Sequence, residues 1–325
     1  MKVIVFGGNG FVGQWLIKAL HKEKTEILCC DIDKFPILKE IPYVQVDICK
    51  QEQLNTIQIT SEDIVVNLAA NQYHGKVPRK NRKEYFFNVN TIGAKNILKI
   101  AYQKGCRNVI QFTTDMVYGK PQYLPIDTNH PKNPFGYYGK SKVETEKVCE
   151  HYRSLGMNIT IFRPRMINGP GRLGILKKLF WLIRWNLPVP TIGNGRNCYQ
   201  MVSVHDCVSA IQCAIKCGIP NEEYNLGSKN SPSTRYLLKN LTHLVGSRSI
   251  VIPTPGVLVK GILSFMNMLG LELMYKEQYM IADENYILDI SKTERELGWE
   301  PQYNDCDMII QAYYSYIKHI KKEEC

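Results

Sequence analysis

The sequence lacks any apolar run long enough to cross a bilayer. A spanning helix needs about 18 uninterrupted apolar residues. The nearest candidate, residues 257–274, is interrupted by Lys260 and Glu272. The apolar run at residues 1–6 ends at once in glycines and is too short for a secretory signal. We therefore expect a cytoplasmic protein in which residues 257–274 form core or lid helices, with contact at a membrane surface as the alternative.

Paired cysteines are also lacking. The 325 residues include 11 cysteines, but none of them forms a Cys-x-x-Cys pair or another spacing typical of a zinc site. This distribution predicts reduced thiols, as in cytosolic proteins, and no metal site.

Acidic residues are fewer than basic ones. The chain has 30 Asp and Glu against 41 Lys and Arg, which gives a formal net charge of +11. A basic protein can bind nucleic acid, an anionic membrane surface or phosphorylated small molecules. No basic run decides between these partners, and we expect a small-molecule substrate and no nucleic acid.

The first half of the chain alternates short β-branched segments with longer helical patterns, which is typical of a parallel sheet covered by helices on both faces. After residue 164 the pattern changes to Gly- and Pro-rich stretches between isolated helices. Strands are expected at residues 3–6, 27–30, 43–46, 64–68, 109–112 and 159–162, and helices at 11–20, 84–103 and 141–155.

The sequence therefore predicts an α/β fold in two domains. Residues 1–165 are expected to form a doubly wound parallel Rossmann sheet, to which residues 195–215 return. Residues 166–325 are expected to form mainly a smaller mixed α/β substrate-binding domain.

A glycine-rich turn lies between the first expected strand and helix, at Gly7, Gly10 and Gly13. These glycines permit a tight turn, close approach of a pyrophosphate and close packing of helix on strand, respectively. Asp31 ends the second strand, at about the distance from the turn at which a carboxylate binds the adenosine ribose. Because a carboxylate repels a 2′-phosphate, we expect NAD rather than NADP, a preference that the nearby Lys34 weakens. A turn-capping aspartate is the alternative interpretation of Asp31.

Further motifs follow in order along the chain. They are Asp47-Ile48, Leu68-Ala69-Ala70, Asn90, Thr113-Thr114-Asp115, Tyr138 with Lys142, Arg163-Pro164, and the Leu-Gly-Trp-Glu-Pro segment at 297–301. In this order they resemble the extended short-chain dehydrogenase/reductases, whose best-known members are nucleotide-sugar epimerases and dehydratases. The resemblance covers nearly the whole chain and implies NAD as the cofactor. The cofactor-binding residues that it implies are Gly7, Asn9, Gly10, Phe11, Val12, Gly13, Asp31, Asp47, Ile48, Leu68, Ala69, Ala70, Asn90, Thr113, Tyr138, Lys142 and Pro164.

Catalysis is assigned to Tyr138, Lys142 and Thr114. A tyrosine four residues before a lysine lies on the same helix face, so the ammonium group can lower the pKa of the phenol toward the working pH. Tyr138 is then the acid and base, Lys142 also holds the nicotinamide ribose, and Thr114, placed by the resemblance, binds the substrate oxygen. The neighbouring Tyr137 has no lysine four residues on.

Two departures from the family pattern concern the substrate. Met116 follows Asp115 where family dehydratases carry glutamate, and methionine cannot transfer a proton. This disfavours a 4,6-dehydratase and leaves Asp115 as a candidate auxiliary acid. In the family pattern, nucleotide-sugar enzymes hold the diphosphate with an asparagine and two arginines. This chain has Met166 at the asparagine position, Tyr199 at the first arginine position and Tyr279 near the second.

Losing charge-assisted contacts of roughly 1.5 to 3 kcal/mol each would weaken diphosphate binding. Either Arg165, Arg172 and Arg196 replace the missing contacts, or the substrate carries its phosphate differently. The alternative interpretation of these arginines is that they are surface charges. The candidate substrate residues are Asp115, Arg165, Arg172, Arg196 and Tyr199.

Three functions remain open. The leading hypothesis is a 4-epimerase for a nucleotide-activated sugar, in which NAD takes a hydride and returns it to the other face. The second is a net oxidoreductase acting on a keto sugar, a lipid-linked sugar or a hydroxysteroid-like substrate, which the apolar stretch 256–274 favours. The third is a noncatalytic NAD-binding protein, which the intact Tyr-Lys pair disfavours. The resemblance also implies a homodimer through the helices at 84–103 and 141–155.

Overall fold

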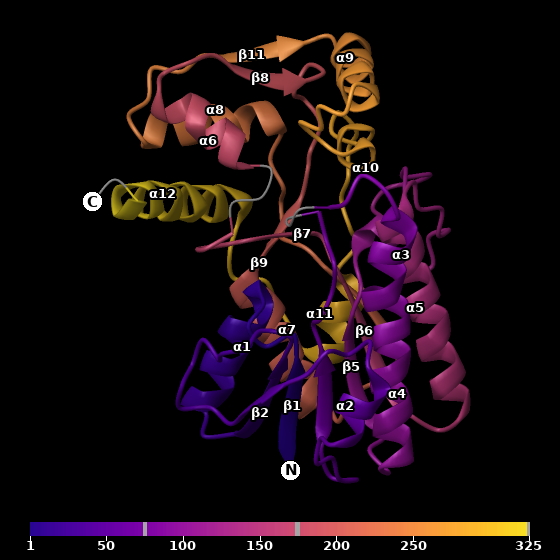
Figure 1. Cartoon of the computed structure of the whole chain (residues 1–325). Coiled ribbons are helices and arrows are strands. Elements are labelled where there is room, and N and C mark those ends of the chain that lie inside the picture. The colour runs from indigo at the N-terminus through magenta and orange to yellow at the C-terminus, as the bar shows by residue number, and fades with distance from the viewer. Residues whose placement is uncertain (74–76, 173–175, 324–325) are drawn as a thin grey trace.

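The computed structural model describes residues 1–73, 77–172 and 176–323. Within these residues the central sheet has seven parallel strands in the order β10-β6-β5-β4-β1-β2-β3 (Figure 1). The strands are β1 (Lys2–Phe6), β2 (Glu26–Asp31), β3 (Tyr43–Gln45), β4 (Ile64–Asn67), β5 (Asn108–Phe112), β6 (Asn158–Pro164) and β10 (Glu223–Leu226). The predicted doubly wound α/β fold is confirmed, and all six expected strands are present. Strand β10 has no expected counterpart, because its sequence Glu-Tyr-Asn-Leu contains no β-branched residue.

The strands of this sheet are covered on both faces. Side chains alternate along β1, so Val3 and Val5 enter one core while Ile4 and Phe6 enter the other. The first core is closed by α1 (Phe11–Lys22) and α7 (Val204–Lys216), and the second by α2 (Gln51–Asn55), α4 (Ala94–Gln103) and α5 (Tyr137–Ser154) (Figure 1). Burial on both faces explains why β1 and β4 are continuous apolar runs rather than alternating ones.

The expected helical stretch at 84–103 is present but is not one regular helix. This stretch is divided into α3 (Arg82–Phe87), a π-helical stretch η1 (Asn88–Gly93) and α4. Hydrophobic periodicity does not distinguish a helix with one wider turn from a regular one. The helix expected at 141–155 begins four residues earlier, at Tyr137, which places Tyr138 in the first turn of α5.

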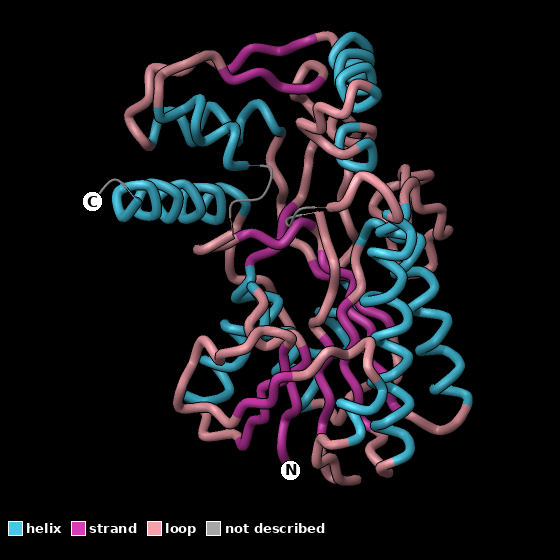
Figure 2. Tube along the Cα trace, in the orientation of Figure 1, coloured by secondary structure: helices cyan, strands magenta, loops and turns pink. Residues whose placement is uncertain are grey.

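The long parallel strands gather in one part of the molecule, and the other part consists of helices and short strands (Figure 2). The second half of the chain contributes to both parts (Figure 1). Helix α7, which falls in the expected return at 195–215, lies at the main sheet, and β10 and α11 (Ser291–Leu297), beyond that range, lie there too. Trp299 is buried there, and its indole N–H donates to the Asp206 carbonyl oxygen at 3.0 Å. The remaining elements are β7 (Met166–Asn168), α6 (Leu176–Arg184), β8 (Val189–Ile192), β9 (Met201–Ser203), α8 (Thr234–Leu244), β11 (Val251–Thr254), α9 (Gly256–Met268), α10 (Lys276–Tyr279) and α12 (Asp305–Glu323). Two parallel pairs, β11 with β8 and β7 with β9, connect them.

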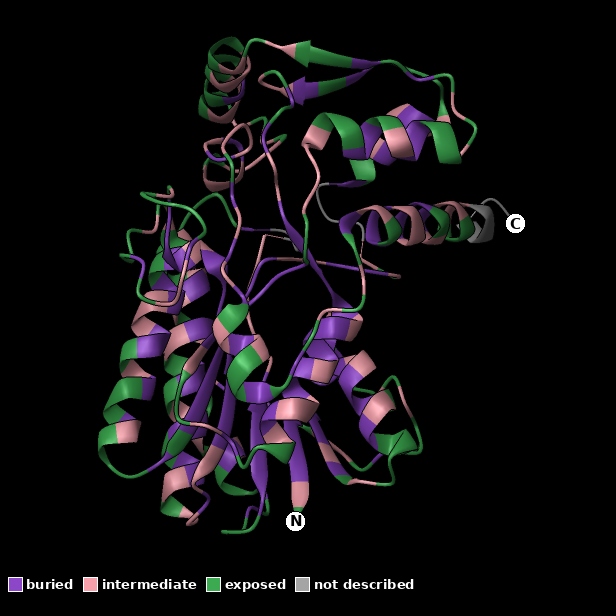
Figure 3. Ribbon diagram, turned by 180° about the vertical axis from the view of Figure 1, so that it is seen from behind, coloured by how far each residue is buried: buried purple, intermediate pink, exposed green. Residues whose placement is uncertain are grey.

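Of the core or lid helices expected at 257–274, the structure forms the helix α9, but not as a core helix. Of the residues in α9 only Leu263 is buried, and most of its surface is exposed in Figure 3. Among the described residues, no helix is both long enough and apolar enough to span a membrane.

Candidate active site

The glycine-rich turn joins β1 to α1 with almost no free space. Gly7 has φ +77°, and a Cβ atom on it would lie 2.6 Å from the Ala69 nitrogen. A Cβ atom on Gly13 would lie 2.4 Å from the Gly7 oxygen. Gly10 precedes α1 without a side-chain cap, so the first-turn N–H groups and the positive end of the helix dipole are not satisfied by a cap. This arrangement fits a pyrophosphate.

Asp31 lies beside this turn at the end of β2. Its Oδ2 accepts a hydrogen bond from the Asn9 N–H at 2.9 Å, and its Oδ1 accepts one from the Ile32 N–H at 2.8 Å. Burial raises the pKa of Asp31, and the hydrogen bond from the Asn9 backbone opposes that rise. The Asn9 amide donates to the Phe35 oxygen at 2.9 Å, which ties the loop after β2 to the glycine turn. The turn thus has a carboxylate at its edge, as the NAD prediction requires.

Asn90 positions two segments of the site. Its Nδ2 donates to the Asn71 oxygen at 3.1 Å and to the Ser141 hydroxyl at 2.9 Å, while its Oδ1 accepts from the Asn71 N–H at 2.9 Å. The predicted pair Asp47 and Ile48 lies in the turn after β3. Asp47 caps this turn, accepting from the Cys49 N–H at 2.9 Å. Ile48 lies against Gly93, where a Cβ atom would come within 2.5 Å of Ile48 Cδ1.

Lys142 is buried on the face of α5 that looks toward β5. Its Nζ donates to the Phe112 carbonyl oxygen at 3.1 Å, and burial lowers the pKa of Lys142 to about 8. Tyr138, one helical turn earlier, is buried against Tyr73 and Phe86, with ring centroids 5.6 and 5.8 Å away. Both side chains are therefore held in fixed positions at the wall of one cavity.

The electrostatics of Tyr138 differ from the expectation. Burial raises the pKa of Tyr138 to about 12, and the charge of Arg172 and a hydrogen bond with the Thr114 side chain oppose that rise. Lys142 is not among the groups that lower the pKa of Tyr138. The Lys142 ammonium group is instead directed to the Phe112 oxygen, and its role in activating the phenol stays a prediction.

Thr114 caps a short 3₁₀ helix, η2 (Asp115–Val117). Its hydroxyl accepts from the Met116 N–H at 3.2 Å and donates to Asp115 Oδ1 at 3.0 Å. The preceding Thr113 directs its hydroxyl elsewhere, donating to Glu146 Oε1 at 2.8 Å. Thr113 therefore lines the cavity wall, but its hydroxyl group bonds to Glu146 behind that wall.

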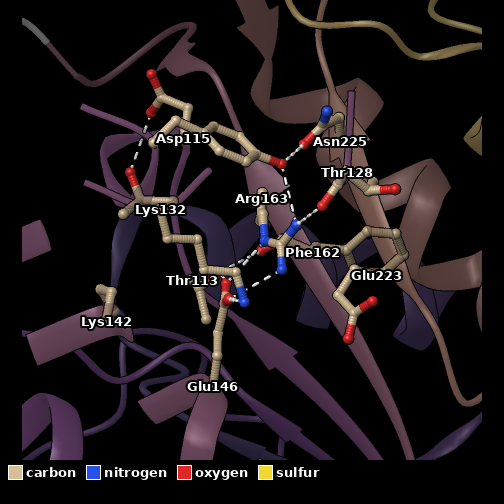
Figure 4. Close-up of polar contacts among 12 residues, drawn as sticks. Thr113, Asp115, Thr128, Lys132, Lys142, Glu146, Phe162, Arg163, Glu223 and Asn225 are labelled. Atoms are coloured by element: carbon tan, nitrogen blue, oxygen red, sulfur yellow. Dashed lines mark hydrogen bonds and ion pairs between the residues drawn. The ribbon is translucent and has the colours of Figure 1, made fainter. Parts of the chain in front are cut away.

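A buried ion pair lies behind this wall (Figure 4). Arg163 donates to both carboxylate oxygens of Glu146, each at 2.9 Å, and to the Tyr118 hydroxyl at 3.0 Å. Lys132 adds a second cation 2.7 Å from Glu146. These charges hold the pKa of Glu146 below its usual range despite burial. The sequence interpretation missed Glu146, although it follows Lys142 at the same four-residue spacing by which Lys142 follows Tyr138.

Arg165 and Asp115 form a second buried pair, at 2.6 Å between Nη1 and Oδ2. The guanidinium group of Arg165 lies between two rings, 4.0 Å from that of Tyr199 and 4.1 Å from that of Tyr286. Burial raises the pKa of Asp115, and the charge of Arg165 opposes that rise. Within the described part of the chain, Nε and Nη2 of Arg165 are buried without a hydrogen-bond partner. Arg165 lines the cavity, so a substrate oxygen can satisfy these donors.

The other two candidate arginines, Arg172 and Arg196, differ in their position relative to the cavity. Arg172 donates to Gln72 Oε1 at 2.6 Å and lies 5.2 Å from the Phe11 ring, at the cavity wall. Arg196 is exposed and does not line the cavity; its backbone N–H donates to Asn194 Oδ1 at 2.8 Å. The expectation that Arg196 contacts substrate is therefore not supported by its position, because the Gly193–Gly195 turn directs it to solvent.

The cavity has a volume of about 920 Å³. That is near the upper end of the roughly 300–1,000 Å³ range of ligand pockets. The predicted residues that line it are Gly7, Gly10, Phe11, Val12, Gly13, Leu68, Ala70, Thr113, Thr114, Asp115, Tyr138, Lys142, Pro164, Arg165, Arg172 and Tyr199. The predicted residues outside its lining are Asn9, Asp31, Asp47, Ile48, Ala69, Asn90 and Arg196. Among the described residues, no group of three or more His, Cys, Asp or Glu can hold a metal ion.

The two ends of the cavity differ in chemistry. The end at the main sheet carries the glycine turn and the polar groups described above. The opposite end is walled mainly by aliphatic and methionine side chains from α6, α8, α9 and the segment after α9, although the lining also includes Lys178, Thr234 and Gln278. The aliphatic and methionine side chains are Leu176, Leu179, Leu182, Leu237, Leu238, Val259, Leu263, Leu273 and Met274.

Comparisons with known proteins agree with this geometry. The family model of the NAD dependent epimerase/dehydratase family matches residues 3–227. A putative UDP-glucose 4-epimerase of Methanocaldococcus jannaschii is 26% identical over 317 residues, covering 92% of this chain and 93% of that protein. An N-acetyl-alpha-D-glucosaminyl-diphospho-ditrans,octacis-undecaprenol 4-epimerase of Escherichia coli O157:H7 is 29% identical over 217 residues, covering 66% of this chain and 63% of that protein.

A solved structure also shares the fold. It is the UDP-glucuronic acid 4-epimerase of Bacillus cereus in complex with NAD, with a TM-score of 0.76, 20% identity, and coverage of 98% of this chain and 99% of that one.

Proposed function

Because the chain belongs to the NAD dependent epimerase/dehydratase family, we propose that it is an NAD-dependent 4-epimerase of the extended short-chain dehydrogenase/reductase type. Its substrate would be an activated sugar, with nucleotide-activated sugars as the first class to consider. The observation that carries this proposal is the meeting of Tyr138, Thr114 and Lys142 with the glycine turn in one cavity. NAD, when bound, supplies a hydride acceptor that later returns the hydride, so no net oxidation results.

In this proposal Tyr138 removes the proton of the substrate hydroxyl and later returns it. Thr114 lies close enough to share a hydrogen bond with Tyr138 and would orient the same oxygen. The charge of Arg172 stabilises the phenolate form. Lys142 would hold the ribose next to the nicotinamide, since it lines the cavity one turn from Tyr138. Arg165 would bind a substrate oxygen through its unsatisfied Nε and Nη2.

The cofactor would lie along the carboxyl ends of β1, β2 and β4. The residues proposed to contact it are Gly7, Asn9, Gly10, Phe11, Val12, Gly13, Asp31, Asp47, Ile48, Leu68, Ala69, Ala70 and Pro164, together with Tyr138 and Lys142. Asn90 and Thr113 are proposed to act by positioning, because their polar side-chain groups bond to protein groups. A dehydratase reaction is disfavoured because Met116 occupies the position of the proton-transferring glutamate.

A second candidate function follows from the apolar end of the cavity. An oxidoreductase or epimerase acting on a lipid-linked sugar, or on an apolar cyclic alcohol, would place its apolar part among the leucines of α6 and α8. The relative from E. coli O157:H7 is named for a sugar carried on undecaprenol diphosphate. An apolar cyclic alcohol carries no diphosphate and needs no diphosphate-binding arginines, whereas a sugar on a lipid diphosphate would need Arg165 or Arg172 in their place.

We also propose a division of the chain and a homodimer. Residues 1–165 would form the NAD-binding unit with α7, β10 and α11, and the rest of 166–325 the substrate-binding unit. The dimer would form through α4 and α5, which lie together at the side of the molecule away from α1 (Figure 1). Light scattering coupled to gel filtration tests the dimer.

The test of the reaction is incubation with NAD and a panel of nucleotide-activated sugars. Products are separated by chromatography while NADH is followed by absorbance. An isomeric product without net NADH, absent in Tyr138→Phe and retained in the matched control Tyr137→Phe, supports the 4-epimerase. Accumulated NADH identifies a net oxidoreductase instead. Silence with nucleotide-activated, lipid-linked and steroid-like substrates alike would contradict both candidates.

A further inference from the structure

Helix α9 presents an uncovered apolar face to solvent. Its members are 50% to 89% exposed, which is unusual for large apolar side chains side by side. We define the α9 apolar face as Val257, Leu258, Ile262, Phe265, Met268 and Leu269. The face continues beyond the helix through Leu271 and Leu273, which are also exposed.

No charge interrupts this face. The lysine of α9, Lys260, is directed to the protein, where its Nζ lies 2.5 Å from Asp283 Oδ1 and donates to the Met280 oxygen at 3.0 Å. The inner side of the helix is apolar as well, since Leu263 is buried and Val259 lines the cavity. Of the other polar side chains of α9, Asn267 donates to the Met274 oxygen at 3.1 Å and Ser264 is exposed. A helix whose solvent side is mainly apolar is stable against another apolar surface. Helix α9 therefore needs a second covering surface.

Basic residues border the α9 apolar face. Arg79 is exposed and donates from Nη2 to the Gly270 oxygen at 2.8 Å, and Lys178 donates to the Leu273 oxygen at 2.7 Å. Lys80 and Lys83, beside Arg79 in the chain, are exposed too. Arg82 pairs with Glu272 in the same border. An apolar face with a cationic border is complementary to the surface of an anionic bilayer.

We propose that the α9 apolar face and its basic border dock this protein on anionic phospholipid membranes. The helix lies in the interface with its outer side chains among the acyl chains, while Arg79, Lys80 and Lys83 contact lipid phosphates. Docking places the apolar end of the cavity, walled by Val259 and Leu263, directly behind the membrane-facing helix. The inference concerns a surface and does not depend on the reaction assigned to the cavity.

The test is co-flotation of the full-length protein with vesicles of phosphatidylcholine alone and of equimolar phosphatidylcholine and phosphatidylglycerol. The wild type should bind the mixed vesicles and bind them less as salt is raised. The variant Ile262→Ser with Phe265→Ser should lose binding at least tenfold. Its matched control is Leu244→Ser with Tyr314→Ser, which removes two side chains of the same exposure, 50% and 56%, from α8 and α12.

Charge is tested separately. The variant Lys80→Glu with Lys83→Glu should weaken binding by at least about 25-fold, from about fivefold for each cation lost. Its control is Lys216→Glu with Lys239→Glu, exposed lysines on α7 and α8. Circular dichroism and NAD binding verify that each variant is folded.

Three outcomes would overturn the proposal. The wild type fails to float with either vesicle; the control pairs lose binding as much as the α9 and border variants do; or Ile262→Ser with Phe265→Ser changes the oligomeric state and leaves flotation unchanged. The last outcome would assign the face to a second copy of the chain.

Discussion

Replacing Lys142 with methionine should stabilise the protein at neutral pH while it abolishes catalysis. Burial lowers the pKa of Lys142 from 10.5 to about 8, a difference that corresponds to roughly 3 kcal/mol between the two protonation states. At about pH 7 the lysine is protonated in both folded and unfolded chains, so the folded state bears this cost. Methionine has similar length and no charge.

The loss of the lysine hydrogen bond offsets part of this gain. The Phe112 oxygen, which accepts from Lys142, also accepts from the Gln111 amide at 2.9 Å and keeps that partner in the variant. A lost hydrogen bond costs about 1 kcal/mol. The variant Lys142→Met should therefore be about 2 kcal/mol more stable at about pH 7.

The pH dependence has a definite sign. As pH rises from about 8 to 10.5, folded Lys142 loses its proton while the unfolded chain keeps it, so the stability of the wild type gains from this group. Buried cysteines such as Cys30, whose pKa burial raises, act in the opposite direction, but they do so in both proteins. The stability advantage of Lys142→Met should therefore disappear as the pH rises, and above about pH 10.5 the variant should be about 1 kcal/mol less stable, because only the lost hydrogen bond remains.

Urea unfolding of the two proteins at several pH values measures this difference. The control is Lys140→Met, which removes an exposed lysine of the same helix and should change stability by less than about 0.5 kcal/mol. A Lys142→Met protein that is less stable than the wild type at neutral pH, or an advantage that does not change with pH, would refute the reasoning. The turnover of Lys142→Met should fall by about 100-fold or more.

Three further changes test the site. Gly13→Ala should weaken NAD binding at least about tenfold, since its Cβ would meet a backbone oxygen at 2.4 Å; unchanged affinity in calorimetric titration argues against the tight turn. Asp31→Asn removes a half-buried charge and should shift the ratio of NADP to NAD affinity about tenfold toward NADP, and an unmoved ratio would count against its ribose role. Glu146→Gln leaves Arg163 without its carboxylate and should lower the free energy of unfolding in urea by about 3 to 5 kcal/mol. The control Glu144→Gln, in an exposed ion pair, should lower it by less than about 1 kcal/mol, and similar values for both would disprove the buried pairing.

Local sequence patterns were enough to predict much of the cavity end that carries the glycine turn. A glycine turn between a buried strand and a helix has few structural solutions, and the alternation of strands and helices defines a doubly wound sheet. The spacing of Tyr138 and Lys142 places them on one face of a helix wherever that helix lies. Glu146 extends the same spacing, so its burial on that face was available from the sequence as well.

Other features depended on segments far apart in the chain. Strand β10 was missed because four residues without β-branching become a strand only when β6 is beside them. Arg196 and Arg165 look alike in sequence, yet one is exposed and the other lies between Tyr199 and Tyr286.

The doubly wound fold, the glycine turn and the tyrosine-lysine pair follow from the amino-acid sequence alone, because each depends on residues close together in the chain. The groups that surround them could be identified only from the packed molecule. Arg172 rather than Lys142 lowers the pKa of Tyr138, and the far end of the cavity is apolar because leucines from separate helices converge there. The exposure of α9 was decided in the same way, since hydrophobic content does not reveal whether another element covers a helix.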